Sequence, residues 1–311
     1  MQKDLLVSVI IPNYNHAKYL DQRIQSVLCQ TYQNFEVIIL DDCSTDDGAS
    51  HAVIEKYRNN NHVMHIVYNE VNSGSTFKQW LKGISLAAGD VIWIAESDDF
   101  CEPNMLELLI NAYMHNPNTV LAYTSLVYVN SEGIPYSTDS NNAPNIYMTG
   151  KQFLKRYMLM YNTVKNASGA IFSKKAAMQV SPKFLQYPGA GDYLFWVEIA
   201  AQGNVAIVNK GLSFFRRHEG VVTSKRDRDG SNLAAEKEIL TYIISLIHPS
   251  SFRNRLTYAN HARRIKDKEF DSIDTKNRIY EIWEVEKHST LLDRVILKIS
   301  DLYLYFFKKR I

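Results

Sequence analysis

Short apolar runs alternate with helical patterns through the first 130 residues. The apolar runs are rich in β-branched residues and are bounded by turn-forming residues, as buried strands are. They occupy residues 7–11, 35–40, 63–68, 91–94 and 120–129. Between them, apolar residues recur at helical spacing over about 17–30, near 53–57, over about 76–88 and near 105–112. Repeated β-α-β units predict an α/β fold, with a mostly parallel sheet flanked by helices on both faces.

Polar residues directly follow three of the predicted strands. These segments are Pro12-Asn13-Tyr14, Asp41-Asp42 and Glu96-Ser97-Asp98-Asp99, and we call the last one the acidic turn. In open α/β sheets the ligand lies outside the carboxyl ends of the strands. We therefore expect the three segments to converge on one site.

The acidic turn carries three carboxyl groups within four positions, on Glu96, Asp98 and Asp99. Carboxylates this close repel one another unless a cation lies between them. Oxygen ligands on short side chains suit Mg²⁺ or Mn²⁺, with phosphate oxygens completing the coordination shell. The alternative is a solvated turn whose acidic residues cap a helix starting near Pro103. This stretch alone leaves both interpretations open.

Charge and motifs argue against several classes of function. The formal net charge is +2, whereas domains that bind nucleic acid are usually strongly basic, so we expect no nucleic-acid partner. No glycine-rich dinucleotide loop follows the first strand, and the chain contains no P-loop motif. The phosphates of a nucleotide would need another partner, such as a metal ion on the acidic turn.

Cysteine usage and the N-terminal segment bear on location. The three cysteines, Cys29, Cys43 and Cys101, are odd in number and lack metal-binding spacing. The first residues do not have the layout of a signal peptide, and no apolar segment is long enough to cross a bilayer. We therefore expect reduced thiols and a cytoplasmic location.

Six motifs occur in order between residue 5 and about residue 130. They are residues 7–15, 26–32 and 35–42, Asn72-Ser73-Gly74, Ala88-Gly89-Asp90 and the acidic turn. Together they resemble the family 2 glycosyltransferases. The resemblance implies a GT-A fold, a nucleotide-sugar donor, a divalent metal ion and usually inversion at the anomeric carbon. It fades between about 130 and 185 and is absent after about 225.

The resemblance also assigns a nucleotide-binding pocket. By similarity, Tyr14 stacks on the nucleotide base, Asp42 accepts a hydrogen bond from it, and Pro12 and Asn15 line the same pocket. An aromatic face beside a carboxylate acceptor suits a uracil or thymine ring, which favours a UDP- or dTDP-sugar donor. The alternatives are that Tyr14 closes the core at a strand end and that Asp42 caps a helix.

Two stretches depart from the family pattern. Glu96 stands where the family usually has Asp, whereas Asp98 and Asp99 match. We expect Asp99 to be the direct metal ligand and Asp98 to contact the sugar or the ribose. Glu96 either reaches a ribose hydroxyl or binds the metal through water. The second departure is Thr76–Lys82, where the family often has Arg-Asn, so a lysine there either contacts phosphate or lies on a solvated helix face.

Two further candidates lie in the second half of the chain. Asp192 follows a glycine-rich turn and begins a predicted helix, at the position where the family often has its catalytic base. The family often has Glu-Asp here, whereas this chain has Gly191-Asp192, so the base matches and its neighbour departs from the pattern. The alternative is a plain helix cap. His218 follows Arg216-Arg217, and in similar enzymes a histidine after such a strand closes over the metal or the diphosphate. The alternative is a surface loop that happens to be charged.

The composition changes beyond Gly230, where helical patterns cover about 232–247, 252–270 and 291–311. We therefore divide the chain into a catalytic domain, residues 1–225, and a helical accessory region, residues 226–311. The last helix has an apolar stripe and ends in aromatic and basic residues. It either packs on the catalytic domain or contacts an anionic membrane, at the inner face of the plasma membrane.

These observations predict a metal-dependent, inverting glycosyltransferase of cell-surface polysaccharide biosynthesis. Its acceptor is expected to be a saccharide or a lipid-linked oligosaccharide. One rival is a nucleotidyltransferase, which would typically have a basic glycine-rich loop where Pro12-Asn13-Tyr14-Asn15 stands. The other is a non-catalytic protein that binds nucleotide sugars or acts as a scaffold, supported by the departures at Glu96 and Gly191.

Overall fold

The computed structural model describes residues 5–141, 143–217, 226 and 228–308, with side chains up to residue 301. One mixed sheet of ten strands forms the centre of the molecule. Its strands are β1 Val7–Asn13, β2 Phe35–Asp41, β3 Val63–Tyr68, β4 Val91–Ile94, β5 Phe100–Cys101, β6 Thr119–Val129, β7 Pro135–Thr138, β8 Ile146–Thr149, β9 Ala170–Ser173 and β10 Asn204–Arg216.

The strand order is β3-β2-β1-β4-β9-β6-β10-β5, with β7 beside β6 and β8 beside β10. The first four strands in this order run parallel, and so do β6 and β10. β9 lies antiparallel between β4 and β6 and joins the two parallel parts. The α/β prediction is confirmed, and the strands that pair antiparallel with their neighbours, β5, β7, β8 and β9, all follow the first four parallel strands in the sequence.

Helices cover both faces of this sheet. They are α1 Ala17–Leu28, α2 Ala49–Glu55, α3 Thr76–Leu86, α4 Met105–His115, α5 Gly150–Phe153, α6 Lys174–Ala177, α7 Gly191–Ala200, α9 Ser231–Ile247, α10 Ser251–Lys266, α11 Ile273–Ile282 and α12 Leu291–Lys308. Neighbouring residues of a strand point to opposite faces. Ile10 packs with α3 and α7, whereas Val9 and Ile11 pack with α1 and α4. The buried strands are apolar on both faces for this reason.

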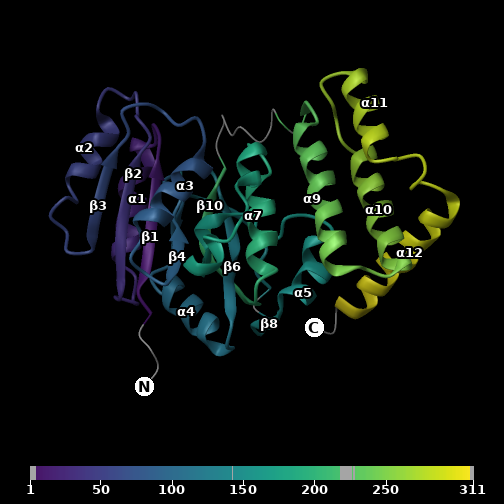
Figure 1. Ribbon diagram of the computed structural model, residues 1–311, viewed down its shortest axis with the longest axis horizontal. Helices are drawn as coiled ribbons and strands as arrows, with labels where there is room; N and C mark the ends of the chain where they lie inside the picture. The colour runs from purple at the N-terminus through teal and green to yellow at the C-terminus, as the bar shows by residue number, and fades with distance from the viewer. Residues whose placement is uncertain (1–4, 142, 218–225, 227, 309–311) are drawn as a thin grey trace.

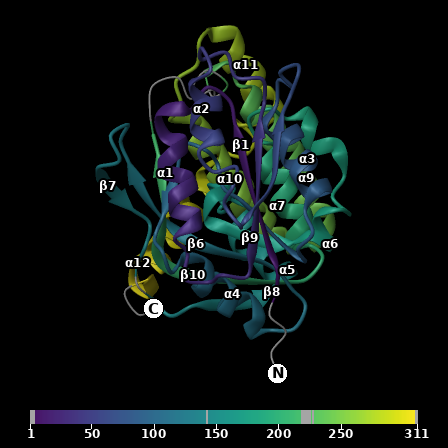
Figure 2. The same ribbon diagram turned by 90° about the vertical axis from the view of Figure 1, so that its left-hand side faces the viewer.

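The C-terminal helices lie on the far side of α7 from the sheet (Figure 1). Buried residues of α9 and α10, among them Leu233 and Ile265, belong to the same hydrophobic core as α7 and α3. The view turned by 90° looks along the molecule from the sheet toward these helices (Figure 2). The division at residues 225/226 stays a prediction, although the two parts share this core. None of the described helices is both long and apolar enough to span a membrane.

Some element boundaries differ from the sequence-based prediction. The segment around Arg216, which we expected in a loop after a short strand, is the end of the 13-residue strand β10. A charged residue is typical of loops, but the Arg216 side chain is buried and bonded to carbonyl groups. Residues 150–160, whose sequence is also typical of a helix, form a short α5 that continues as a π-helix at Leu154–Met158.

Candidate active site

The three polar strand ends lie together at the carboxyl edge of the parallel strands. Asn13 is paired with Asp41 in the sheet register, and its Nδ2 donates to Asp41 Oδ1 at 2.7 Å. The acidic turn follows β4, and the N–H of Ala95 donates to the carbonyl of Ile10. His16 Nδ1 lies 2.8 Å from Ser97 Oγ, which ties the loop after β1 to the acidic turn.

The residues expected around the nucleotide base occupy the loop after β1. Pro12 is buried within the strand, whereas Tyr14 is 43% exposed and Asn15 is exposed. Asn15 has a φ of 55°, and its side chain exchanges hydrogen bonds with Thr45. An exposed Tyr14 does not close the core, so its ring face is open to a planar ligand.

Asp42 is held by the loop before α3. Its carboxylate accepts hydrogen bonds from Asn69 Nδ2, from the N–H and hydroxyl of Ser73, and from Gln79 Nε2, at 2.6–2.9 Å. The N-cap of α2 is Gly48, so Asp42 is not a cap of that helix. Four protein donors nearly fill the acceptor capacity of a carboxylate. Three of them bond to Oδ1 and one bonds to Oδ2, so Oδ2 can accept one further hydrogen bond, such as one from a base N–H.

The two lysines of the Thr76–Lys82 stretch bond to the same loop. Lys78 Nζ donates to the Ser73 carbonyl at 2.9 Å, and Lys82 Nζ donates to Asn69 Oδ1. Both therefore support the loop that holds Asp42.

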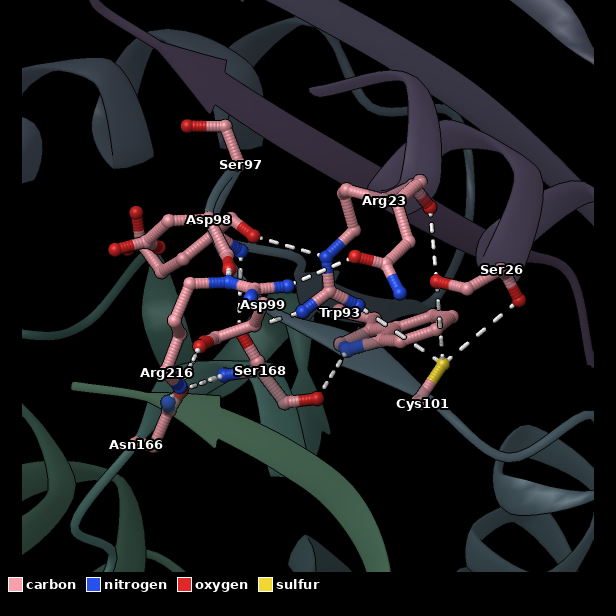
Figure 3. A network of polar contacts seen from close by, with 12 residues as sticks. Arg23, Ser26, Trp93, Ser97, Asp98, Asp99, Cys101, Asn166, Ser168 and Arg216 are labelled. Atoms are coloured by element: carbon pink, nitrogen blue, oxygen red, sulfur yellow. Dashed lines mark hydrogen bonds and ion pairs between the residues drawn. The ribbon is translucent and has the colours of Figure 1, made fainter. Parts of the chain in front are cut away.

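Asp99 lies at the centre of a buried polar network (Figure 3). Its side chain is 1% exposed, and Oδ2 accepts hydrogen bonds from Asn166 Nδ2 at 2.7 Å and from Ser168 Oγ at 2.6 Å. Oδ1 accepts the N–H of Arg216 at 2.9 Å. Burial and the neighbouring Asp98 carboxylate raise the pKa of Asp99, while Arg23 opposes that rise.

Two buried arginines hold the acidic turn from opposite sides (Figure 3). Arg23 on α1 is fully buried, donates to the Glu96 carbonyl at 2.8 Å, and places NH2 3.9 Å from Asp99 Oδ2. Arg216 at the end of β10 donates through Nε to the Asp98 carbonyl at 2.7 Å. The hydrogen bonds of Arg23 and Arg216 to backbone carbonyls therefore fix the orientation of the acidic side chains of the turn.

Glu96 and Trp80 form a hydrogen-bonded pair. The indole Nε1 of Trp80 donates to Glu96 Oε1 at 2.8 Å, and Trp80 itself is 3% exposed. Burial and the Asp98 carboxylate raise the pKa of Glu96 to about 8, although the Trp80 hydrogen bond lowers it. The two departures from the family pattern, at Glu96 and at Thr76–Lys82, are therefore in direct contact.

The donor set of the acidic turn fits a divalent cation held by few protein ligands. Asp98 is partly exposed, and Oδ1 of Asp99 accepts a single protein hydrogen bond, which leaves room for one more partner. Burial, followed by the Asp98 carboxylate, raises the pKa values of both Glu96 and Asp99. No cluster of three or more His, Cys, Asp or Glu side chains suited to a metal occurs among the described residues, and His218 lies outside them. Phosphate oxygens would have to supply the remaining ligands.

Asp192 lies in the first turn of α7, and the N-cap of that helix is Ala190. Asp192 is therefore not the N-cap residue itself, although its carboxylate still lies beside N–H groups of the first turn. Asp192 Oδ2 accepts a hydrogen bond from Asn162 Nδ2 at 2.8 Å. Burial raises the pKa of Asp192 to about 6, while the N–H of Tyr193 and the Asn162 amide lower it. A carboxylate with this pKa is ionised at neutral pH and is a stronger base than an exposed aspartate.

One loop connects Asp192 with the acidic turn. It carries Asn162, which bonds to Asp192, and then Asn166 and Ser168, which bond to Asp99. Sequence reasoning did not predict these hydrogen bonds, nor the contacts that Arg23 and Arg216 make with the acidic turn. Only the burial of Arg23 could have been noticed in the sequence, because Arg23 lies on the otherwise apolar face of α1 beside Leu20, Ile24 and Val27.

Comparisons with known proteins agree with this architecture. The model of Glycosyl transferase family 2 matches residues 8–180. Glycosyltransferase GlyG of Streptococcus pneumoniae is 30% identical over 164 residues, which are 53% of this chain and 50% of GlyG. An uncharacterized glycosyltransferase of Haemophilus influenzae is 28% identical over 260 residues, covering 79% of this chain and 77% of that protein. This chain thus matches about half the length of GlyG.

A solved structure extends the similarity to the fold. The structure of Staphylococcus aureus TarS residues 1–349 in complex with UDP-GlcNAc superimposes with a TM-score of 0.65 and 19% sequence identity, covering 89% of this chain and 79% of that one. At this identity the match speaks for the fold, which is of the GT-A type. Because the family model covers more than half of the sequence, including the strand ends that form the site, this chain belongs to glycosyltransferase family 2.

Proposed function

We propose that the protein transfers a sugar from a UDP-sugar, or a dTDP-sugar, to a saccharide or lipid-linked acceptor in cell-surface polysaccharide biosynthesis. The observation that carries this proposal is the meeting of the Tyr14 loop, Asp42 and the acidic turn at one sheet edge. S. aureus TarS, a poly(ribitol-phosphate) beta-N-acetylglucosaminyltransferase, has been solved with UDP and with UDP-GlcNAc. This supports a uracil nucleotide as the donor here.

In the proposed complex, the base stacks on the exposed ring of Tyr14, with Pro12 and Asn15 lining the pocket. Asp42 lies at the rim of this pocket and is held by Asn69, Ser73 and Gln79. We therefore expect Asp42 to shape the pocket through this loop as well as through any contact with the base.

The acidic turn is the proposed metal site. Asp99 is the proposed direct ligand for Mg²⁺ or Mn²⁺, with Asp98 toward the sugar or ribose and His218 as a further candidate ligand. A bound divalent cation offsets the charge that develops on the leaving diphosphate. The buried contacts of Arg23, Arg216 and Ser168 hold both aspartates before the ligand arrives, so no reorganisation is needed during the reaction.

Asp192 is the proposed catalytic base. As the acceptor oxygen forms its bond to the anomeric carbon, the Asp192 carboxylate takes the hydroxyl proton and the bond to the diphosphate oxygen breaks. Attack from the face opposite the leaving group inverts the anomeric carbon. Asn162 holds the carboxylate in place for this transfer.

The two rival functions differ in what they predict for this site. A nucleotidyltransferase would cleave the nucleotide between its phosphates. A scaffold or binding protein would bind the donor without turnover. The crowded carboxyl groups, with their raised pKa values, favour a site that carries out chemistry over a plain binding surface.

The last helix supplies a possible contact with a membrane. On α12, Leu292, Val295 and Ile299 are 45–59% exposed and follow one another at helical spacing. The acidic residues of α12 face α10, where Asp293 pairs with Arg255 and Asp301 pairs with Arg263. The outward surface is therefore apolar and basic, as in helices that lie on anionic membranes. We propose that this face brings the enzyme to a lipid-linked acceptor.

A thermal-shift series tests the proposed donor and metal together. UDP-, dTDP- and GDP-sugars are compared with Mn²⁺, with Mg²⁺ and with EDTA, because a ligand that binds the folded state raises the melting temperature. We expect uracil or thymine nucleotides to stabilise the protein only with metal. The Asp99→Asn variant should lose the metal dependence. Equal stabilisation in EDTA, or by all nucleotides, would contradict the proposal.

A further inference from the structure

The C-terminal helices approach the segment that carries Asp192. A Cβ atom on Gly189 would lie 2.1 Å from Oδ1 of Asn232, which shows how closely the start of α9 packs on this segment. Glu236 lies one turn after Asn232 on the same face of α9. Its carboxylate pairs with Arg264 of α10, and both side chains are only partly exposed.

The same helices hold the loop on the other side of Asp192. His261 of α10 is 2% exposed, and its Nε2 donates to the carbonyl of Leu159 at 2.9 Å. Its Nδ1 lies 3.2 Å from Arg264 NH2 and accepts from it, which fixes the neutral tautomer. Arg264 thus joins Glu236 to His261, and His261 fixes the loop three residues before Asn162.

Asn162 has a fixed orientation in this arrangement. Its Oδ1 accepts the N–H of Val164 at 3.1 Å, so its Nδ2 is the group directed at Asp192. Tyr193, the next residue on α7, donates its hydroxyl to the Met158 carbonyl. The start of α7, the loop and α9–α10 therefore form one packed unit around the Asp192 carboxylate.

We propose that Asn162 and Glu236 are positioning residues that set the base strength of Asp192, so that α9 and α10 are part of the active site. This inference rests on the proposed role of Asp192 as the base. The Asn162 amide stabilises the anion by a hydrogen bond, whereas the Glu236 carboxylate destabilises it by like charge. The two residues act in opposite directions, which a general loss of packing would not reproduce.

The charges around Asp192 are consistent with this balance. Burial raises its pKa, Glu236 adds to the rise, and Asn162 opposes it. Charged groups on the packed elements include Glu236 on α9, Arg264 on α10 and Arg226, whose side chain lies near Gly189. Arg264 draws the Glu236 carboxylate toward α10 and partly neutralises it.

Direct titration of Asp192 tests the inference without using enzyme activity. The full chain is labelled with ¹³C at aspartate carboxyl groups, and the Asp192 resonance is the one lost in the Asp192→Asn variant. Asn162→Ala should raise the measured pKa by about 0.5 or more, and Glu236→Gln should lower it by a smaller amount. Arg264→Gln should raise it, because the Glu236 charge is then uncompensated.

Glu238→Gln is the matched control. Glu238 lies on the same helix, but its carboxylate bonds to Tyr187 and faces Lys183, so its loss should leave the pKa of Asp192 unchanged. If Asn162→Ala and Glu236→Gln shift the pKa in the same direction, or if neither shifts it, the inference is wrong. The same holds if Glu238→Gln acts like Glu236→Gln. The proposed function is tested separately, by the rate of sugar transfer in Asp192→Asn.

Discussion

At the scale of single residues, the two stretches that depart from the family pattern, Glu96 and Thr76–Lys82, contact each other. Glu96 is one methylene longer than the family's usual Asp, and the structure places the Trp80 indole where it can hold the longer carboxyl group. Gln79, the neighbour of Trp80, donates to Asp42. Helix α3 thus contacts both the proposed base pocket and the acidic turn. The sequence shows two separate departures from the family pattern, but it does not show that they are in contact.

Replacing Trp80 with Phe isolates this contact. The ring should remain packed against Phe77 and Phe195, whose centroids lie 5.1 and 5.5 Å away, while the N–H is lost. We expect the free energy of unfolding to fall by about 1 kcal/mol, the net contribution of one intramolecular hydrogen bond. Urea unfolding measures the change. In a Glu96→Ala background the same substitution should have no further effect, and an equal fall there would contradict the pairing.

At the scale of elements, apolar periodicity located the strands and helices of the first 130 residues because these elements bury regular faces. It could not locate polar groups that become buried only through tertiary contacts. Arg216 reads as a loop residue in the sequence, yet β10 extends to it because carbonyl groups and the acidic turn satisfy its guanidinium. The many arginines of helix α10 likewise predict an exposed helix, although His261 on the same helix is buried.

His261 should make the fold sensitive to acid. Burial, followed by the Arg264 charge, lowers the pKa of His261 from 6.5 to about 3. Between these values the unfolded chain binds a proton that the folded protein does not bind. The free energy of unfolding should therefore fall as the pH drops below about 6.5, by at most about 1.4 kcal/mol per pH unit.

Urea unfolding at pH 6.5, 5.5 and 4.5 measures this slope. A His261→Gln variant keeps a donor for the Leu159 carbonyl but has no titrating group, so its stability should depend less steeply on pH. Parallel pH dependences of the two proteins would show that His261 does not contribute.

At the scale of the whole molecule, the C-terminal helices are joined to the catalytic part by a continuous core and by polar contacts beside Asp192. The sequence pattern predicted the C-terminal helices but did not indicate which face of each helix is buried. On the outward face of α12, the apolar residues Leu292, Val295 and Ile299 are exposed.

Substitutions on that face test membrane contact without disturbing the packed side. Leu292, Val295 and Ile299 are changed together to Gln, and binding to vesicles of anionic lipid is measured by sedimentation at low salt. We expect binding to be lost, with the melting temperature nearly unchanged because these side chains are exposed. Ile273→Gln, an exposed site on α11, serves as the control. Binding that survives in the triple variant, or that is absent in the unchanged protein, would contradict the proposal.

The central claim is that Asp192 is the base of an inverting sugar transfer, and its most direct test is the Asp192→Asn variant. Donor affinity should stay within a few-fold, while the rate of transfer falls by roughly 10²–10⁴, the usual contribution of general-base catalysis. In the unchanged enzyme the rate should fall about tenfold per pH unit below about pH 6, where Asp192 becomes protonated. A folded Asp192→Asn variant that transfers sugar at a near-normal rate would contradict the account.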